Sequence, residues 1–401
     1  MSIIVQKYGG SSVASEERMR LVARKVVAAR RSGLDVVVVV SAMGNTTSEL
    51  LDLATNLAPQ PARRELDMLL SAGERISMSL LAMTILQMGE PAISLTGPQA
   101  GIKTTDTHFN ARIVDVQPDR VRQELAAGKV VVVAGYQGFN GKGEVTTLGR
   151  GGSDTTAAAL AAALDAECCE ICSDVEGVFT ADPRVVNDAR LLNELHHEEM
   201  LEMARHGASV LNPRAVEYAW KRDLDLRARG TFVDAEGTLI TRTANVAGDE
   251  SICGIAGHPS LVRINTANDE ESRAITADLL GDADVFLTVE HDDGRRDLYV
   301  PATEIADIKA LERQLDKRID GAVHVETGLA SASAIGLKAG CCRKLRDRLD
   351  AALADTGVEC KGVFCGTHSL AAIVPRRERA NVMKWLHRQF IEQPATRQAV
   401  A

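Results

Sequence analysis

The chain has 401 residues, which is too long for one ordinary hydrophobic core, so two or three domains are expected. Its formal net charge of −9 argues against a nucleic-acid binder, because such proteins neutralise phosphates with basic residues. Apolar residues make up 45% and aromatic residues 3%, so the cores must be built from Val, Leu, Ala and Ile. These values favour an enzyme that acts on small molecules.

The N-terminal segment lacks the basic start, long apolar run and cleavage site of a secretory signal. No stretch shows the roughly 18 uninterrupted apolar residues that span a bilayer. We therefore expect a cytoplasmic protein without a membrane or nucleic-acid partner. The eight cysteines are scattered, and the isolated C-x-x-C of Cys169 and Cys172 lies in a strand-like segment. We interpret these thiols, and the Cys341 and Cys342 pair, as packing groups rather than metal or redox sites.

The first half of the chain alternates strands and helices. Apolar runs at 3–6, 36–40, 129–134 and 168–173 are predicted strands, and the five valines of 36–40 are typical of a strand buried on both faces. Helical patterns cover 16–32, 62–88 and 157–164. This alternation predicts an α/β fold, with a central, mostly parallel sheet and helices on both faces.

Four polar loops, most of them with glycines, follow these strands at 7–12, 41–47, 149–154 and 173–184. Because ligands bind beyond the carboxyl ends of the strands in such sheets, we expect the loops to share one site. None of them has the Walker sequence or the dinucleotide-binding fingerprint, which disfavours both of those classes. What remains is a phosphate-binding site with one early lysine, Lys7.

The chain is organised around the glycine-rich turn at 147–156, which leads directly into an alanine-rich helix. Glycines allow backbone conformations in which several N–H groups point toward the same place. Ser153, Asp154 and Thr155 are residue types that cap a helix. The exposed amides and the helix dipole attract phosphate or carboxylate. Arg150 adds a planar fork that suits an anion with two oxygens. The turn is therefore predicted to bind an anion.

Five motifs, in order, resemble the successive signatures of aspartate kinases, which have the amino-acid kinase fold. They are Lys7-Tyr8-Gly9-Gly10-Ser11-Ser12, Ser41-Ala42-Met43-Gly44, Ala72-Gly73-Glu74-Arg75, Gly149-Arg150-Gly151-Gly152-Ser153-Asp154 and Phe179-Thr180-Ala181-Asp182-Pro183-Arg184. The resemblance implies transfer of the ATP γ-phosphoryl group to the side-chain carboxylate of L-aspartate, giving 4-phospho-L-aspartate for lysine, threonine and methionine biosynthesis. It implies Mg²⁺ through ATP chemistry, since no metal-ligand pattern is visible in the sequence.

The resemblance also implies roles for the motif residues. Lys7 would stabilise charge on the transferring phosphate, and Asp154 would hold this lysine or the metal-bound nucleotide in place. No general base is needed, because the carboxylate that attacks is already ionised at pH 7. The residues implied to bind L-aspartate are Ser41, Thr47, Glu74 and Arg150, with Arg150 at a carboxylate and Glu74 at the ammonium group. Those implied to surround the nucleotide are Gly9, Gly10, Ser11, Ser173, Asp174, Asp182 and Arg184.

One departure from the family lies at Ser209. Where the family usually reads Gly-Ala-Lys-Val-Leu-His-Pro, this chain has Gly-Ala-Ser-Val-Leu-Asn-Pro at 207–213. The family's lysine approaches the nucleotide phosphates, so Ser209 removes one positive charge from a site that must neutralise several. Arg205 and Lys221 are the candidates to replace it.

A linker with Gly230, Gly237 and Gly248 leads to the second half, where the predicted strands include separate ones at 322–326 and 331–336. This half reads as short strands and helices in a pattern that occurs twice. It resembles the paired ACT domains of aspartate kinases, which are α+β units of ferredoxin-like type. The predicted domains are therefore a catalytic domain at 1–245 and ACT-like domains at 251–320 and 321–401. The Gln-Asn and Ser-Glu pairs expected in the effector loops are absent. We expect feedback control to be altered or lost, and the ACT-like domains to form a homodimer or higher homo-oligomer.

Two other interpretations stay open at this point. A kinase of the same family could act on a different acidic amino acid, although the loops at 41–47 and 149–154 keep the aspartate pattern. A non-catalytic regulatory paralogue is also compatible with Ser209. The presence of Lys7, Arg150 and Asp154 opposes that alternative.

Overall fold

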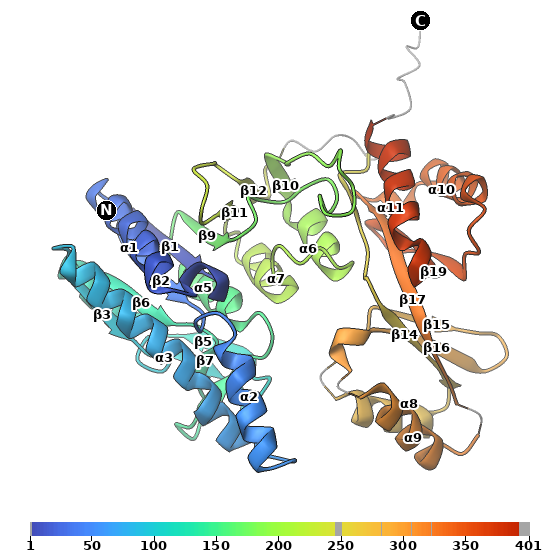
Figure 1. Cartoon of the computed structure of the whole chain (residues 1–401), viewed down its shortest axis with the longest axis horizontal. Coiled ribbons are helices and arrows are strands. Elements are labelled where there is room, and N and C mark those ends of the chain that lie inside the picture. Colours follow the sequence, from blue (N-terminus) through green and yellow to red (C-terminus); the bar gives the residue numbers. More distant parts are fainter. Residues whose placement is uncertain (1, 245–250, 282, 306, 322, 393–401) are drawn as a thin grey trace, which may run out of the picture. The chain divides into compact units, whose positions relative to one another are not determined.

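The computed structural model describes residues 2–244, 251–281, 283–305, 307–321 and 323–392 (Figure 1). They form two compact units. The first unit comprises Met1–Val178, Leu191–Leu201 and Ser209–Asn245, and the second comprises Phe179–Arg190, Glu202–Ala208 and Val246–Ala401. The division into three domains stays a prediction, and its limits at residues 1, 245 and 401, like Gly248 of the predicted linker, lie outside the described residues.

The first unit is built on an eight-stranded sheet in the order β10-β12-β11-β9-β1-β2-β6-β3. Its strands are β1 (Ile3–Tyr8), β2 (Asp35–Val40), β3 (Ala92–Leu95), β6 (Val130–Ala134), β9 (Cys168–Ser173), β10 (Glu194–His196), β11 (Leu226–Gly230) and β12 (Thr238–Thr241). All neighbouring pairs are parallel except β11 and β12. The predicted mostly parallel sheet is confirmed, and each strand predicted for this half belongs to it.

Helices cover both faces of this sheet. The helices of the first half are α1 (Glu16–Arg31), α2 (Thr46–Leu57), α3 (Arg63–Gln87), α4 (Asp119–Ala126) and α5 (Gly152–Ala163), followed by α6 (His197–Arg205) and α7 (Pro213–Lys221). Apolar side chains of α1 and α3 form one core with β2 and β6. α5 packs against β1, β2 and β9. Val36–Val40 of β2 are therefore fully buried, which is why this strand consists of valines without alternation.

Four short strands that the sequence analysis did not predict form a separate sheet in the order β5-β4-β7-β8. They are β4 (Ile102–Thr104), β5 (Ile113–Val116), β7 (Gln137–Phe139) and β8 (Val145–Thr147). Strands of three or four residues are too short to show a hydrophobic period, so the pattern of the sequence does not reveal them. β8 ends where the glycine-rich turn begins.

Among the described residues, one helix is long and apolar enough in composition to cross a membrane, namely α3. Its best 18-residue window has a mean hydropathy of 1.3, and half of that window is buried inside the protein. The buried side of α3 includes Asp67 and Glu74, and the helix packs against α1, β3 and β6. The apolar composition of α3 is therefore explained by its place in the core of the first unit.

The second unit contains a seven-stranded sheet in the order β15-β16-β14-β17-β19-β18, with β13 paired to β17. The strands are β13 (Gly254–Ala256), β14 (Leu261–Ala267), β15 (Leu287–Glu290), β16 (Arg295–Pro301), β17 (His324–Ile335), β18 (Gly362–Cys365) and β19 (Ser369–Pro375). Its helices are α8 (Glu270–Leu280), α9 (Ile308–Arg318), α10 (Arg343–Thr356) and α11 (Arg379–His387). Neighbouring strands are antiparallel.

The strands of both predicted ACT-like units join this one sheet. Separate strands are predicted at 322–326 and 331–336, but residues 324–335 form the single strand β17, and residue 322 lies outside the described residues. β17 pairs with β14 through its first half and with β19 through its second half. Gly328, with a φ of 78°, lies between the two paired segments, which explains why the sequence pattern breaks there.

The cysteines of β9 are free thiols in the sheet. Burial is the main cause that raises the pKa of Cys172 to about 12, so the thiol stays protonated at neutral pH. This supports their interpretation as packing groups. The same interpretation is wrong for Cys341, which is exposed. Its place in the short helical turn Ala339–Cys341, before α10 begins, leaves its side chain in solvent.

Candidate active site

The centre of the candidate site is an ion pair between Lys7 at the end of β1 and Asp154 in the first turn of α5. Lys7 Nζ lies 2.6 Å from Asp154 Oδ1, and both side chains are 12% exposed. The residues are far apart in the sequence, yet β1 and α5 pack together. The site therefore presents a fixed ammonium group beside the N-terminus of a helix, an arrangement that favours anions.

The loops after neighbouring strands meet at this point. A β-carbon at Gly10 would lie only 2.9 Å from the Ala42 carbonyl oxygen, so the 7–12 and 41–47 loops are in backbone contact. The Gly9 N–H donates to the Cys172 carbonyl, which ties the first loop to the end of β9. A β-carbon at Gly135 would collide with Ser153 of the glycine turn. These contacts bring the 7–12 and 41–47 loops, the end of β9 and the glycine turn together at one edge of the sheet, although the glycine turn follows β8 of the separate sheet. The predicted 173–184 loop belongs to the second unit from Phe179 onward.

The glycine turn itself differs from the prediction in its helix cap. The structure shows no side-chain cap from Ser153, Asp154 or Thr155, because α5 already begins at Gly152 and its N-cap is Gly151. Gly151 has a φ of 72°, a conformation that glycine adopts without strain. The carboxylate of Asp154, which the sequence offered as a cap, instead binds Lys7.

Arg150 lies exposed in the glycine turn, between two glycines with positive φ. The Asn212 side chain supports this turn, because its Nδ2 donates to the Arg150 carbonyl over 3.2 Å. A β-carbon at Gly151 would lie 2.0 Å from the same Nδ2 atom. Asn212 also caps α7 through a hydrogen bond from the Arg214 N–H. The asparagine that replaces the family's histidine therefore joins the glycine turn to α7.

Glu74 is buried in the middle of α3, with 3% of its surface exposed. Its Oε1 accepts a hydrogen bond from the Ala42 N–H at 3.0 Å, whereas its Oε2 is buried without a hydrogen-bond partner. Burial raises the pKa of Glu74 to about 7, against the lowering effect of the Ala42 N–H. A cation placed at Oε2 would therefore gain a hydrogen bond and stabilise the ionised carboxylate.

The two remaining predicted substrate residues lie on the 41–47 loop and the helix that follows it. The Ser41 carbonyl accepts from the Ser77 hydroxyl on α3, one turn beyond Glu74. Thr47 lies in the first turn of α2, so the predicted loop is shorter than expected and ends in a helix. Both residues are half-buried. The 41–47 loop is thus held against the same stretch of α3 that carries Glu74.

Five of the predicted nucleotide residues, Gly9, Gly10, Ser11, Ser173 and Asp174, lie in the Lys7 loop or at the end of β9. Ser11 lies in the short 3-10 helix Gly10–Val13, and its carbonyl accepts from Arg18. The Ser173 carbonyl, at the end of β9, accepts from the Thr231 N–H, and Thr231 Oγ1 lies 2.7 Å from Ser12 Oγ. Asp174 is exposed. The 7–12 loop and the end of β9 are thus joined around Lys7.

Asp182 and Arg184 belong to the second unit, where they bind each other. Arg184 donates from Nε and Nη2 to the two oxygens of Asp182, a bidentate pair. The hydrogen bond from Arg184 is the main cause that lowers the pKa of Asp182. Their predicted role at the nucleotide stays a prediction.

The candidates to replace the family's missing lysine are not equivalent. Ser209 is exposed, as a lysine at this position would need to be. Lys221 lies at the last position of α7, while Asn212 at its other end contacts the glycine turn. The helix is about 12 Å long at 1.5 Å per residue, and Lys221 Nζ pairs with Glu217 at 2.6 Å. Lys221 is therefore a poor substitute for the missing charge. Arg205 belongs to the second unit.

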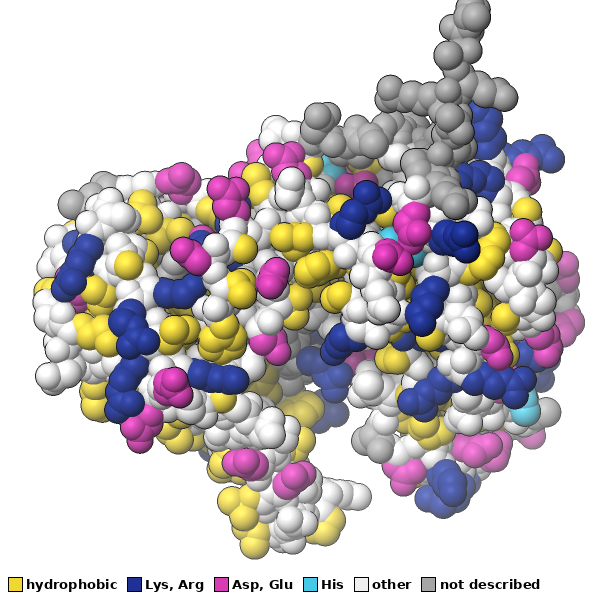
Figure 2. All heavy atoms as spheres, turned by 45° about the horizontal axis from the view of Figure 1, so that its top comes forward, with side chains coloured by type: hydrophobic (Ala, Val, Ile, Leu, Met, Phe, Trp, Pro, Cys, Tyr) yellow, Lys and Arg dark blue, Asp and Glu magenta, His cyan; other side chains and the backbone are white. Residues whose placement is uncertain are grey.

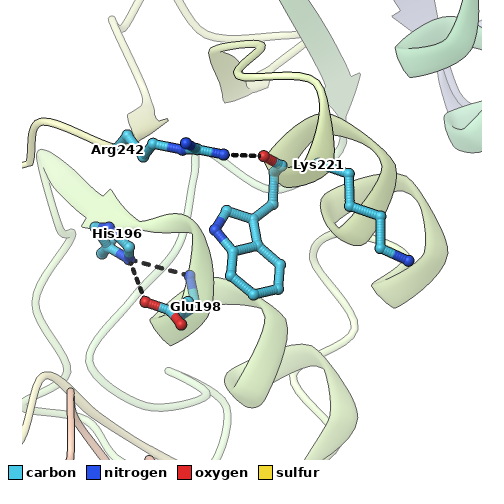
Figure 3. A pocket seen from close by; sticks show the side chains of 5 residues that line it. His196, Glu198, Lys221 and Arg242 are labelled. Atoms are coloured by element: carbon cyan, nitrogen blue, oxygen red, sulfur yellow. Dashed lines mark hydrogen bonds and ion pairs between the residues drawn. The ribbon is translucent and has the colours of Figure 1, made fainter.

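Lys221 instead lines a pocket of about 500 Å³ whose other walls are His196, Glu198, Trp220 and Arg242 (Figure 3). β10 and β12 run antiparallel to β11 and its parallel neighbours, so His196 at the end of β10 lies at the opposite edge of the sheet from Lys7. Lys221 and Arg242 are engaged in ion pairs with carboxylates. This pocket is separate from the candidate site.

Three groups on or beside α3 were not predicted from the sequence. Tyr136 adopts a φ of 67°, and burial raises the pKa of its hydroxyl to about 12. Gln137 is fully buried, donates to the Ser71 carbonyl and leaves its Oε1 without a hydrogen-bond partner. Asp67 is a second fully buried acid on α3. Its spacing of seven residues from Glu74, which places both on one side of the helix, was the signal that could have revealed it.

Comparison with known proteins decides the family. The model of the amino acid kinase family matches residues 2–227. An aspartokinase of Geobacillus stearothermophilus is 41% identical over 97% of both chains. The chain is an aspartokinase of the amino acid kinase family. An aspartokinase of Corynebacterium glutamicum is 48% identical over 75% of this chain and 77% of its own. The structure of E. coli aspartokinase III in complex with aspartate and ADP matches with a TM-score of 0.79 and 25% identity, over 96% of this chain and 99% of that chain. The family predicted from the five motifs is thus confirmed.

Proposed function

We propose that the chain transfers the γ-phosphoryl group of ATP to the side-chain carboxylate of L-aspartate. The observation that carries the proposal is the Lys7 ammonium group, held by Asp154 beside the N-terminus of α5. The nucleophile is already ionised at neutral pH, so the enzyme must supply alignment and charge neutralisation rather than a base. The aspartokinase of E. coli that resembles this fold was solved with aspartate and ADP, which supports the assignment of both ligands.

Lys7 would neutralise charge on the phosphoryl group during transfer. A β-carbon at Gly9 would lie 3.5 Å from Lys7 Nζ, so the glycine leaves this face of the ammonium group open. The amides of the 7–12 loop and of the first turn of α5 add donors for phosphate oxygens. Asp154 would orient the lysine, because its carboxylate lies 2.6 Å from the ammonium group in the first turn of α5.

Arg150 and Glu74 would bind the substrate at its two ends. The exposed guanidinium group of Arg150 suits a carboxylate, and the buried Glu74 Oε2, which lacks a partner, suits the ammonium group. An ammonium group there would compensate for the burial that raises the pKa of Glu74. Ser41 and Thr47 would line the space between these groups.

The nucleotide would bring Mg²⁺ to the site. Within the described residues, no group of three or more His, Cys, Asp or Glu side chains could hold a metal ion. The Asp154 carboxylate is engaged by Lys7. The residues present therefore fit an ion that is bound chiefly by phosphate oxygens and water, as Mg²⁺ often is in kinases. The ion would supply further neutralisation of phosphate charge.

Nothing in the part of the chain that the structure describes favours a different acidic substrate or a non-catalytic paralogue. On the face shown in Figure 2, Lys and Arg side chains are interspersed with Asp and Glu side chains. Such a mixed surface agrees with an enzyme whose substrates are small molecules. A cytoplasmic location and assembly into a homodimer or higher homo-oligomer through the ACT-like domains complete the proposal. Altered or absent feedback control is part of it, since the effector-loop residues expected from the family are not in the sequence.

The test is turnover of ATP and Mg²⁺ with L-aspartate, with the acyl phosphate trapped by hydroxylamine. We expect aspartyl hydroxamate from the wild type, none from Asp154→Ala, and none when L-glutamate replaces L-aspartate. Addition of lysine and threonine tests feedback control, and we expect little inhibition. A folded wild-type protein that binds ATP but forms no hydroxamate would refute the proposed function.

A further inference from the structure

We propose that Asp67 is a positioning residue that fixes the turn carrying Arg150 relative to Glu74, and so sets the geometry in which L-aspartate is bound. The inference rests on the proposed function, which assigns Arg150 and Glu74 to the substrate. Asp67 lies on α3, outside the five motifs, and its surface is fully buried. It does not contact the reacting groups and acts through the residues that it holds.

Hydrogen bonds from two separate segments converge on the Asp67 carboxylate. Its Oδ1 accepts from the Thr147 hydroxyl at 2.5 Å and from the Phe109 N–H at 3.0 Å. Its Oδ2 lies 2.6 Å from His108 Nδ1. Charged acceptors make the stronger hydrogen bonds, so this one side chain joins α3 to residues 108–109 and to the end of β8.

The segment that Asp67 holds lies directly against the glycine turn. Thr147 is three residues before Arg150, and its carbonyl accepts from the Ala111 N–H at 2.8 Å. A β-carbon at Gly149 would lie 2.4 Å from Asn110 Oδ1, so residues 109–111 and the turn are in close contact. A shift of Thr147 or of Phe109 would therefore move the backbone that carries Arg150.

The same helix carries the other substrate contact. Glu74 follows Asp67 by seven residues, which is two turns of helix and about 10 Å along its axis. Both side chains are buried on one side of α3. The helix between them is rigid, so the bonds of Asp67 fix the distance between Arg150 and Glu74, the two groups that would bind the ends of the substrate.

The energetic cost of this arrangement also indicates function. A fully buried carboxylate loses its hydration, and well-packed apolar residues often stabilise a core at least as well. Phe109 has a φ of 74°, an unusual conformation for a bulky residue, and its N–H is one of the donors to Asp67. Such costs tend to concentrate at functional sites, where they fix a required geometry.

The experiment measures kcat and the KM values for L-aspartate and ATP in four single variants of the full chain and in the double variant Asp67→Asn/Thr147→Val. Asp67→Asn removes the charge and one acceptor, and Thr147→Val removes only the hydroxyl donor. Thr147→Ser retains that hydroxyl and serves as the conservative rescue. Glu170→Gln is the matched control, because Glu170 is also a buried acid, but its hydrogen bonds go to Gln6 and Arg229 rather than to the glycine turn.

We expect Asp67→Asn and Thr147→Val to raise the KM for L-aspartate roughly tenfold, since small misplacements of binding groups are costly. The KM for ATP should stay within about twofold, and Thr147→Ser and Glu170→Gln should behave like the wild type. The Asp67→Asn and Thr147→Val effects should be non-additive, because both break one interaction.

Three outcomes would overturn the positioning role. They are equal changes in the KM values for L-aspartate and ATP, an unchanged KM for L-aspartate in Thr147→Val, and an equal rise of that KM in Glu170→Gln. Wild-type turnover separates these outcomes from failure of the proposed function. If the wild type forms no aspartyl hydroxamate, the proposed function fails. If it does and the variants match it, only the role of Asp67 fails. Should Asp67→Asn not fold, the pair Thr147→Val and Thr147→Ser still decides the question.

Discussion

Two glutamates, one in each unit, are shielded from solvent but differ in their hydrogen-bond partners. Glu74 in the first unit has one oxygen without a hydrogen-bond partner, and burial raises its pKa to about 7. Glu202 in the second unit is also largely removed from solvent, but its Oε1 accepts from Ser369 at 2.6 Å and lies 3.3 Å from His206 Nε2. Burial alone would raise the pKa of Glu202, yet the hydrogen bonds and charge of His206 and Ser369 lower it to about 2.

The contrast distinguishes a binding group from a structural one. The partners of Glu202 come from the turn after α6 and from β19, so its interactions are completed within the folded second unit. Glu74 Oε2 has no such partner within the protein, and under the proposed function the substrate ammonium group would supply it. We therefore propose Glu74 as a binding group, whereas the hydrogen bonds of Glu202 hold elements of the second unit together.

The largest effect should come from the ammonium group at the centre of the first unit. Lys7→Met should lower kcat by about a thousandfold, because it removes charge stabilisation from the transferring phosphoryl group. Lys221→Met is the matched control, since Lys221 is exposed and pairs with Glu217 at the far end of α7. Its hydroxamate formation should stay near the wild-type rate, and an equal loss in both variants would contradict the assignment of Lys7.

The two glutamates can be compared directly in binding. Glu74→Gln should raise the KM for L-aspartate on the order of a hundredfold, because a neutral amide replaces the partner of the substrate ammonium group. Glu202→Gln should leave that KM unchanged and lower the Tm. Steady-state kinetics and thermal unfolding of both variants test this. A normal KM for L-aspartate in Glu74→Gln would show that the unpaired oxygen does not bind substrate.

Stability should depend on pH in opposite senses at the two sites. The pKa of Glu74 is about 7 when folded and near 4.5 when unfolded, so the folded protein binds the extra proton and stability falls as pH rises from 4.5 to 7. The shift corresponds to about 3 kcal/mol. For Glu202, with a folded pKa of about 2, stability falls as pH drops below 4.5.

Denaturant unfolding of the two Gln variants between pH 3 and pH 8 measures these slopes. Glu74→Gln should flatten the loss of stability between pH 4.5 and 7, and Glu202→Gln should flatten the loss at acid pH. If the Glu74→Gln variant keeps the wild-type slope above pH 4.5, another group causes it.

A smaller effect on stability should distinguish a glycine with a close neighbour at its Cα from one without such a neighbour. Gly151 in the first unit and Gly357 in the second have φ values of 72° and 65°. Alanine at either position costs about 1 kcal/mol of backbone strain. Only at Gly151 would the β-carbon meet another atom, Asn212 Nδ2 at 2.0 Å. Gly151→Ala should therefore lose about 2 kcal/mol more than Gly357→Ala in urea unfolding, and it alone should lose activity. Equal losses would mean that the turn is more pliable than its contacts indicate.

The smallest effect should follow from restoring the family's lysine. Ser209→Lys places one more charge at an exposed position that the family uses near the nucleotide phosphates. We expect the KM for ATP to fall a few-fold, because one added ion pair in solvent contributes little. The KM for L-aspartate should not change. Ser209→Gln, of similar length but neutral, is the control, and an equal improvement in both variants would exclude charge as the cause.

Much of the first unit could be predicted from local patterns. The predicted strand at 168–173 coincides with β9, and the valine runs belong to β2 and β6. A run of valines is informative because it reports burial on both faces whatever the neighbouring element is. The strand at 324–335 could not be predicted as one element, because its two halves pair with different strands and each half shows its own pattern.

The sequence by itself determined which chemical groups the candidate site contains. They are the ammonium group of Lys7, the guanidinium group of Arg150 and the carboxylates of Glu74 and Asp154. These choices depend on residue type and backbone freedom, which are local properties. Only the tertiary structure decided which groups meet. Asp154 binds Lys7 instead of capping α5, and Asp67 reaches Thr147 across eighty residues of sequence. Such contacts leave no local pattern, because a hydrogen bond between distant segments depends on how whole elements pack.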